Sequence, residues 1–178
     1  MNFRNRFFVL LALLTVGMFT NLNAQDEKSK RPSPLMEAKA SVDDLTIDID
    51  YGSPAVKGRK IWGSLEPYGE VWRTGANEAT TFEVNKDVVI NGEKLAAGKY
   101  SLFTIPTEKD WTVIFNKEAN QWGAYNYKQD KDALRITVKT DKAPVLTERL
   151  TFKVDEKTGK VTFLWENVTF HFDVKKAG

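Results

Sequence analysis

The stretch that decides the fold is LTIDIDY at residues 45–51, in which apolar and polar side chains alternate at every position. Successive side chains of a β-strand point to opposite faces, so this pattern predicts a half-buried strand. Its apolar face carries Leu45, Ile47, Ile49 and Tyr51. The acidic pair before it, residues 43–44, is typical of a turn from a preceding short strand.

Similar short runs recur along the rest of the chain, separated by turn residues. Asn91-Gly92 is the strongest hairpin motif, because both turn positions require positive φ. The runs 161–165 and 168–174 are out of phase by one residue, which predicts a turn or bulge at Glu166-Asn167. No helix longer than two turns is predicted. The expected fold is all-β, an antiparallel β-sandwich or open barrel of about 8–10 strands. The expected strands cover residues 38–42, 45–51, 81–85, 88–90, 99–105, 111–116, 134–140, 145–154, 161–165 and 168–174.

Residues 1–24 have the pattern of a secretory signal peptide. Arg4 and Arg6 precede an apolar run of 13 residues, and a short polar segment then ends at Ala24. A helix needs about 20 residues to cross a bilayer, so no permanent membrane span is expected. We expect cleavage after Ala24 and a periplasmic or secreted protein. Residues 25–34 are predicted to form a flexible leader, and residues 35–178 a single β-sandwich domain.

Composition excludes several classes of function. Cleavage would leave 154 of the 178 residues, with 24 basic and 24 acidic side chains, because two of the 26 basic residues lie in the signal segment. A neutral chain without a basic stripe is not expected to bind nucleic acid. The absence of cysteine and the single histidine exclude thiol catalysis and zinc sites built on thiolates or several imidazoles. We therefore expect a monomer with no cofactor and no metal.

A long irregular stretch near residues 52–80 is the first place to expect a site. It lies between two predicted strands and has neither a two-residue alternation nor a helical period. Connections of this length are uncommon in compact domains and are usually functional. Arg73 offers a planar five-donor fork, and Asn77 and Glu78 add an amide and acceptors. Arg59 and Trp62 form a second pair that could stack on a sugar.

A second irregular stretch, EANQWGAYNYKQD at residues 118–130, is predicted to form the opposite wall of the same cleft. The competing structural interpretation has Arg73 paired with Glu78 and the tryptophans in the core. The predicted binding residues are Arg59, Trp62, Trp72, Arg73, Asn77, Glu78 and Tyr125.

Four motifs carry a family resemblance: YGSPAVKGRKIWG, PYGEVWRTGANEAT, GKYSLFTIP, and WTVIFN with a downstream WG and tyrosine. Together they resemble the family catalogued as domain of unknown function 2911, found in secreted proteins of Bacteroidetes-type bacteria. The resemblance covers about residues 33–174. It implies an exported, single-domain, all-β protein, and it brings no established activity, substrate or catalytic residue.

Three hypotheses of function remain open from the sequence. The first is a non-catalytic module that binds a polar ligand, either a glycan fragment or a small carboxylate. The second is a hydrolase in which Glu78 acts as general acid or base and Arg73 stabilises negative charge; its glutamate should have a raised pKa. The third is an envelope interaction scaffold, which should present a wide apolar patch instead of a concave pocket.

Overall fold

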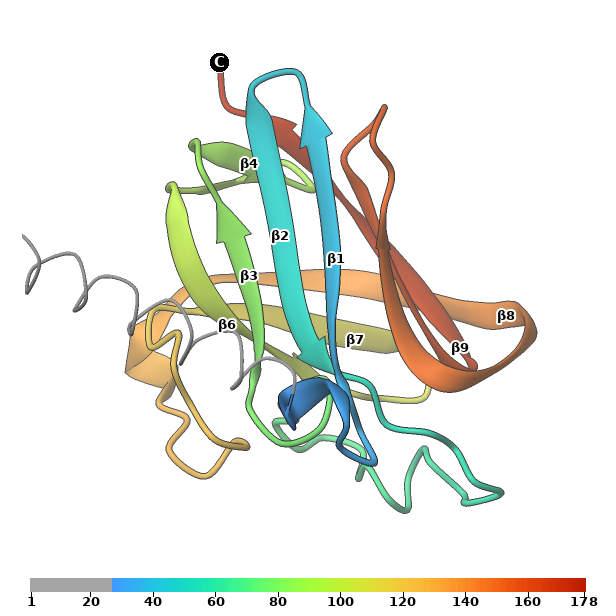
Figure 1. The fold of residues 1–178 in the computed structure, drawn as a ribbon. Coiled ribbons are helices and arrows are strands. Elements are labelled where there is room, and N and C mark those ends of the chain that lie inside the picture. Colours follow the sequence, from blue (N-terminus) through green and yellow to red (C-terminus); the bar gives the residue numbers. More distant parts are fainter. Residues whose placement is uncertain (1–26) are drawn as a thin grey trace, which may run out of the picture.

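The computed structural model describes residues 27–178 (Figure 1). The predicted signal segment and the first two leader residues lie outside the described residues. Within the described part, no helix is long and apolar enough to cross a membrane. The strands are β1 (Leu35–Val42), β2 (Leu45–Gly52), β3 (Thr80–Val84), β4 (Val88–Ile90), β5 (Glu93–Leu95), β6 (Gly98–Ile105), β7 (Asp110–Asn116), β8 (Asp132–Val154) and β9 (Lys160–Lys176), with a short 3-10 helix η1 (Gln129–Lys131) before β8.

All nine strands belong to one antiparallel sheet in the order β1-β2-β3-β6-β7-β8-β9-β4-β5. The sheet coils without closing into a barrel, and Figure 1 shows β7 and β8 crossing behind β1, β2 and β3. Rings from distant parts of the order meet inside: Tyr51 of β2 lies 5.2 Å from Phe152 of β8, and Phe82 of β3 lies 6.3 Å from Phe172 of β9. The all-β prediction is confirmed, with a sandwich-like core between the two halves.

Strand β2 has the burial that its alternation predicts. Its four apolar side chains are buried in the core, and the polar positions between them are partly exposed. The turn motif between β4 and β5 is also confirmed, because Asn91 and Gly92 have φ of 50° and 96°. Local sequence therefore sets both the face and the turns of these strands.

Strands β8 and β9 differ from the expectation, since each joins two runs that were predicted as separate strands. β8 has 23 residues and β9 has 17. Register shifts in the β8–β9 pairing near Thr147 let β8 pair with β7 through its first part and with β9 through its second. Glu166 has φ of 55°, which confirms the irregularity predicted where the phase of β9 changes. Bulges bend a strand without ending it, so a local break in pattern was mistaken for a strand end.

The irregular stretch between β2 and β3 is anchored by two tryptophans. Trp62 and Trp72 are only 8% and 4% exposed. Trp62 lies 4.7 Å from Trp111 between ring centroids, and Trp72 lies 5.7 Å from Trp165. Trp72 also exchanges two backbone hydrogen bonds with Thr104 of β6, at 2.8 and 2.9 Å. This connection, residues 53–79, is called the first loop below. It covers the core and is held there by its two buried tryptophans.

Replacement of a loop tryptophan should test this anchoring. Trp62→Ala removes a large buried ring and should destabilise the domain by about 3 to 5 kcal/mol, or roughly 10 °C in melting temperature. The matched control is Trp122→Ala, because Trp122 is 55% exposed. Thermal unfolding followed by circular dichroism gives both values, and equal shifts would contradict the anchoring role.

Candidate functional site

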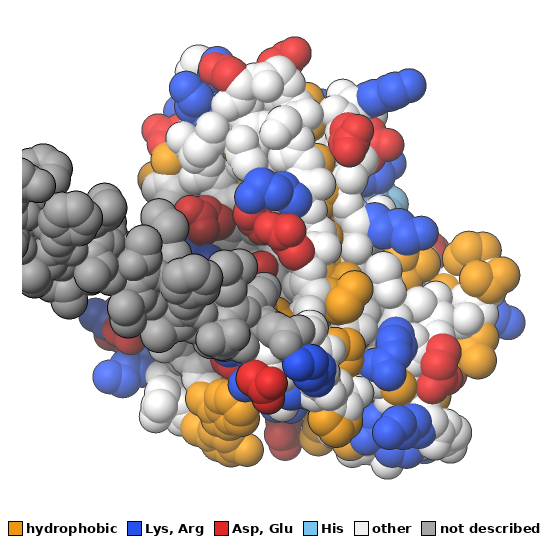
Figure 2. Space-filling view, viewed as in Figure 1, with side chains coloured by type: hydrophobic (Ala, Val, Ile, Leu, Met, Phe, Trp, Pro, Cys, Tyr) orange, Lys and Arg blue, Asp and Glu red, His pale blue; other side chains and the backbone are white. Residues whose placement is uncertain are grey.

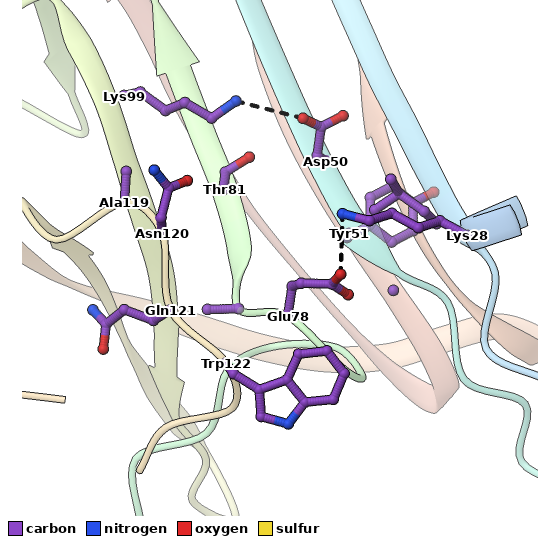
Figure 3. A pocket seen from close by; sticks show the side chains of 13 residues that line it. Lys28, Asp50, Tyr51, Glu78, Thr81, Lys99, Ala119, Asn120, Gln121 and Trp122 are labelled. Carbon is purple, nitrogen blue, oxygen red and sulfur yellow. Dashed lines mark ion pairs between the residues drawn. The ribbon is translucent and has the colours of Figure 1, made fainter. Parts of the chain in front are cut away.

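A pocket of about 390 Å³ opens on the outer face of the sheet, where the first loop ends (Figure 3). Its charged lining consists of two lysines and two carboxylates, and acidic and basic side chains lie next to one another on this face in Figure 2. The exposed aromatic side chain of Trp122 forms part of the wall. The lining residues are Lys28, Leu35, Asp50, Tyr51, Gly52, Glu78, Ala79, Thr81, Lys99, Ala119, Asn120, Gln121 and Trp122.

The floor of the pocket belongs to a polar row that crosses four strands. The register pairs Asp50 with Thr81, Thr81 with Ser101, and Ser101 with Asn116, from β2 to β7. Each of these positions alternates with core-facing residues, so their side chains point to the outer face. The row ends in the pocket at Asp50 and Thr81, whereas Ser101 and Asn116 are buried.

Residues 117–131 cover the buried end of this row and form one wall of the pocket. Gln121 donates to the Glu118 carbonyl at 2.8 Å and to Ser101 Oγ at 3.3 Å. Asn116 donates to Asp132 Oδ1 at 2.8 Å, and Tyr127 donates to the other oxygen of that carboxylate at 2.7 Å. These bonds fix the wall to the sheet, so the pocket is largely preformed.

The first loop and this wall are joined directly beside Trp122. The Ala79 N–H donates to the Gln121 carbonyl at 2.9 Å, and the Gly123 N–H donates to the Asn77 carbonyl at 3.0 Å. Glu78 and Trp122 therefore lie opposite each other in an antiparallel bridge, with both side chains at the pocket (Figure 3). The expected meeting of the two irregular stretches occurs here.

The segment before β1 also reaches the pocket. Lys28 Nζ lies 3.1 Å from Glu78 Oε1, and Arg31 Nη1 donates to both Glu78 oxygens at 2.8 and 3.1 Å. Asn77 donates its amide hydrogen to the Ser33 carbonyl at 3.1 Å. The leader was expected to be flexible because it has nothing apolar to bury. In the structure, leader residues from Lys28 onward are held to Glu78 by ion pairs and to Asn77 by a hydrogen bond.

The ion pairs set the charge state of Glu78. Partial burial acts to raise its pKa, but hydrogen bonds from its own backbone N–H and from Lys28, with the charges of Lys28 and Arg31, lower it below 4.5. A lowered pKa means that the stabilisation from these contacts is present above about pH 4.5 and is lost as the pH falls. Near neutral pH this carboxylate is an ionised hydrogen-bond acceptor.

One group of described residues has the spacing of metal ligands. Carboxylate oxygens of Glu37, Asp48 and Asp50 lie within 4.8 Å of one another on β1 and β2. Lys39 forms ion pairs with Asp48 and, at 3.7 Å, with Glu37, while Lys99 lies 3.6 Å from Asp50. Lysine ammonium groups thus already balance this acidic cluster.

The predicted site residues separate into different environments. Trp62 and Trp72 are in the core, where they cannot stack on a ligand. Arg59 donates to the carbonyls of Val56 and Ala55 at 3.0 and 2.5 Å and so closes its own turn. The two tryptophans follow the structural interpretation that the sequence analysis left open.

The remaining four predicted residues have different surroundings and do not form one cluster. Arg73 does not pair with Glu78; its charge acts on Glu66, another residue of the first loop. Asn77 holds the leader, and Tyr125 is 85% exposed and does not line the pocket. Of the seven predicted residues, Glu78 alone lines the pocket.

Sequence reasoning missed most of the polar lining. Asp50 and Thr81 were visible as outward positions of predicted strands, but many other outward positions looked alike. Lys28 was placed in a flexible leader, and Lys99 in an ordinary strand. Trp122 entered the prediction only as part of the stretch 118–130, the expected opposite wall. The position of Trp122 directly after the polar pair Asn120-Gln121 was the one available sign that it differs from the core tryptophans.

Comparison with known proteins gives a family match. A family model described as a protein of unknown function (DUF2911) matches residues 33–174. No curated protein and no solved structure matches the chain.

Glu66 provides a test of the electrostatics of the first loop. Burial raises its pKa from 4.5 to about 7, although the charges of Arg73 and Arg59 act to lower it. A carboxyl group with a raised folded pKa costs stability as the pH rises from about 4.5 through about 7. Glu66→Gln should therefore leave the melting temperature unchanged near pH 4.5. At pH 8 the substitution should raise the free energy of unfolding by on the order of 2 kcal/mol. A decrease in stability at that pH would contradict the burial of this charge.

A second test concerns the docked leader. Glu78→Gln removes the charge that holds Lys28 and Arg31, so trypsin should cleave after Lys28 roughly threefold faster or more. The matched control is Glu70→Gln, an exposed position of the first loop. Mass spectrometry of the time course measures both rates. Equal rates for the two variants would show that Glu78 does not hold the leader.

Proposed function

We propose a binding function for this chain, which belongs to the DUF2911 family of proteins of unknown function. It is a non-catalytic module that binds a glycan fragment in the pocket beside Trp122. The family description assigns no activity, so the proposal rests on the pocket. Exported as expected from residues 1–24, the domain would act in the periplasm or outside the cell as a monomer that needs no cofactor.

The exposure of Trp122 carries this proposal. Four of the five tryptophans are buried, whereas Trp122 is 55% exposed and lines the pocket next to hydrogen-bonding groups. An indole face beside polar side chains suits a sugar, which has an apolar ring face and hydroxyl edges. Asp50 and Thr81 on the floor and Asn120 in the wall supply the acceptors and donors for those hydroxyls.

A small carboxylate is the weaker ligand for this pocket. Both lysines of the lining already face acidic side chains: Lys28 pairs with Glu78 at 3.1 Å and Lys99 with Asp50 at 3.6 Å. An anion would have to compete with these carboxylates and would itself be repelled by them. Neutral or cationic groups meet no such penalty.

The other two hypotheses receive less support. A hydrolase based on Glu78 requires a raised pKa and a nearby Arg73, but the pKa of Glu78 is lowered by Lys28 and Arg31, and Arg73 acts on Glu66. A scaffold requires a wide apolar patch. On the face that Figure 2 shows, the hydrophobic side chains lie in separate groups with charged side chains between them. The concave pocket, with both apolar and polar lining, therefore favours the binding module.

The proposal predicts that Trp122→Ala weakens the binding of neutral oligosaccharides about tenfold, the effect of losing a stacking contact worth roughly 1 to 1.5 kcal/mol. Isothermal titration calorimetry with a panel of neutral tetrasaccharides is the measurement. The matched control is Tyr125→Ala, since Tyr125 is an exposed aromatic residue in the same segment that does not line the pocket. Equal effects of the two variants, or no binding by the unaltered protein, would contradict the proposal.

A further inference from the structure

We infer that the glycan carries a free ammonium group, as an amino sugar does, and that Lys28 of the leader occupies the position of that group in the structure. This inference rests on the proposed function and narrows it to a class of ligand. The ammonium of Lys28 stands in for that of the ligand at Glu78.

The geometry around Glu78 supports a cation site. Two positive side chains of one segment meet this carboxylate, Lys28 at 3.1 Å and Arg31 at 2.8 Å. The Glu78 side chain is 31% exposed, so it is partly removed from water. A carboxylate in that state loses stability if its counter-ion leaves without replacement. Any ligand that displaces both Lys28 and Arg31 from Glu78 must therefore bring a positive group of its own.

Charge balance in the pocket supports the same conclusion. Among the lining residues, Lys28 and Lys99 balance Asp50 and Glu78. Asp50 and Lys99 belong to strands, and Glu78 is fixed by its bridge to Trp122, so three of the four charges are built into the scaffold. Lys28 alone comes from the segment before β1. If Lys28 leaves together with Arg31, which pairs with Glu78 from the same segment, the remaining charges of the lining sum to one negative charge.

The leader can release Glu78 without losing its other attachments. The Ser53 N–H donates to the Pro34 carbonyl at 2.8 Å, and Asn77 donates to the Ser33 carbonyl at 3.1 Å. Arg149 donates to the Pro32 carbonyl at 3.4 Å. These bonds hold residues 32–34 at the entry to β1. Lys28 and Arg31 precede them in the chain, so both side chains can move away while the start of the domain stays in place.

Trp122 is positioned to favour a cation as well as a sugar ring. It lies opposite Glu78 in the bridge between residues 77–79 and 121–123. An ammonium group between a carboxylate and an indole gains both an ion pair and a cation–π contact. The neighbouring sugar unit of the same glycan would contact the polar floor of the pocket at Asp50 and Thr81.

The test compares two probes that differ only at nitrogen, the β-linked tetramers of glucosamine and of N-acetylglucosamine. Calorimetry at about pH 5.5 keeps the glucosamine amines protonated and Glu78 ionised, because its pKa lies below 4.5. The variants are Lys28→Gln/Arg31→Gln and Glu78→Gln in the mature chain. Lys86→Gln is the matched control, since Lys86 pairs with Asp44 and does not line the pocket.

We expect the double variant to bind the glucosamine tetramer about tenfold more tightly than the unaltered protein, with no change for the acetylated tetramer. Glu78→Gln should bind both tetramers equally, and Lys86→Gln should behave as the unaltered protein. Should Glu78→Gln not fold, the double variant still decides the question, because its changes lie in the leader. Unchanged glucosamine binding in the double variant would overturn the inference.

The outcomes separate this inference from the proposed function. If the acetylated tetramer binds through Trp122 and the glucosamine tetramer has no advantage in any variant, the glycan module stands and the ammonium site is wrong. If neither tetramer binds any variant, and no other oligosaccharide of the panel binds, both proposals fail together.

Discussion

The packing of Trp62 and Trp72 against Trp111 and Trp165 is the contact on which the rest of the structure depends. The first loop has no regular hydrogen-bonded structure of its own, so its path across the core is set by two large buried rings. Because that path is fixed, the loop reaches β3 at a defined point, and Glu78 arrives beside Trp122. Core packing thus determines the position of a surface carboxylate.

The pocket follows from a second constraint: polar side chains on the outer face of the sheet must either be covered and hydrogen-bonded or remain in contact with solvent. A row of polar side chains crosses β2, β3, β6 and β7, and residues 117–131 cover only part of it. Side-chain bonds from Gln121, Asn116 and Tyr127 satisfy the covered part. The uncovered part is left with paired charges, which are polar enough to bind a ligand and already balanced without one.

Much of the fold could be predicted from local patterns. The alternation of Leu45 to Tyr51, the Asn91-Gly92 turn and the change of phase at Glu166 all have the expected structural consequence. The continuity of β8 and β9 could not be predicted, because bulges near Thr147 and Glu166 interrupt the pattern without ending the strand. Much less of the pocket lining was predictable: among its charged residues the sequence analysis named Glu78, but not Asp50, Lys99 or Lys28.

The sequence by itself determined which faces of the strands are buried, where most turns fall and that the chain is all-β, because each of these depends on neighbours a few positions away. Only the tertiary structure decided that Trp62 and Trp72 are core residues and Trp122 a surface one, and that Lys28 and Arg31 meet Glu78. Tryptophan is equally suited to a core and to a binding surface. Its role is set by which distant segments pack over it, and the partner of a charge some 50 positions away in the chain is set by the same non-local packing.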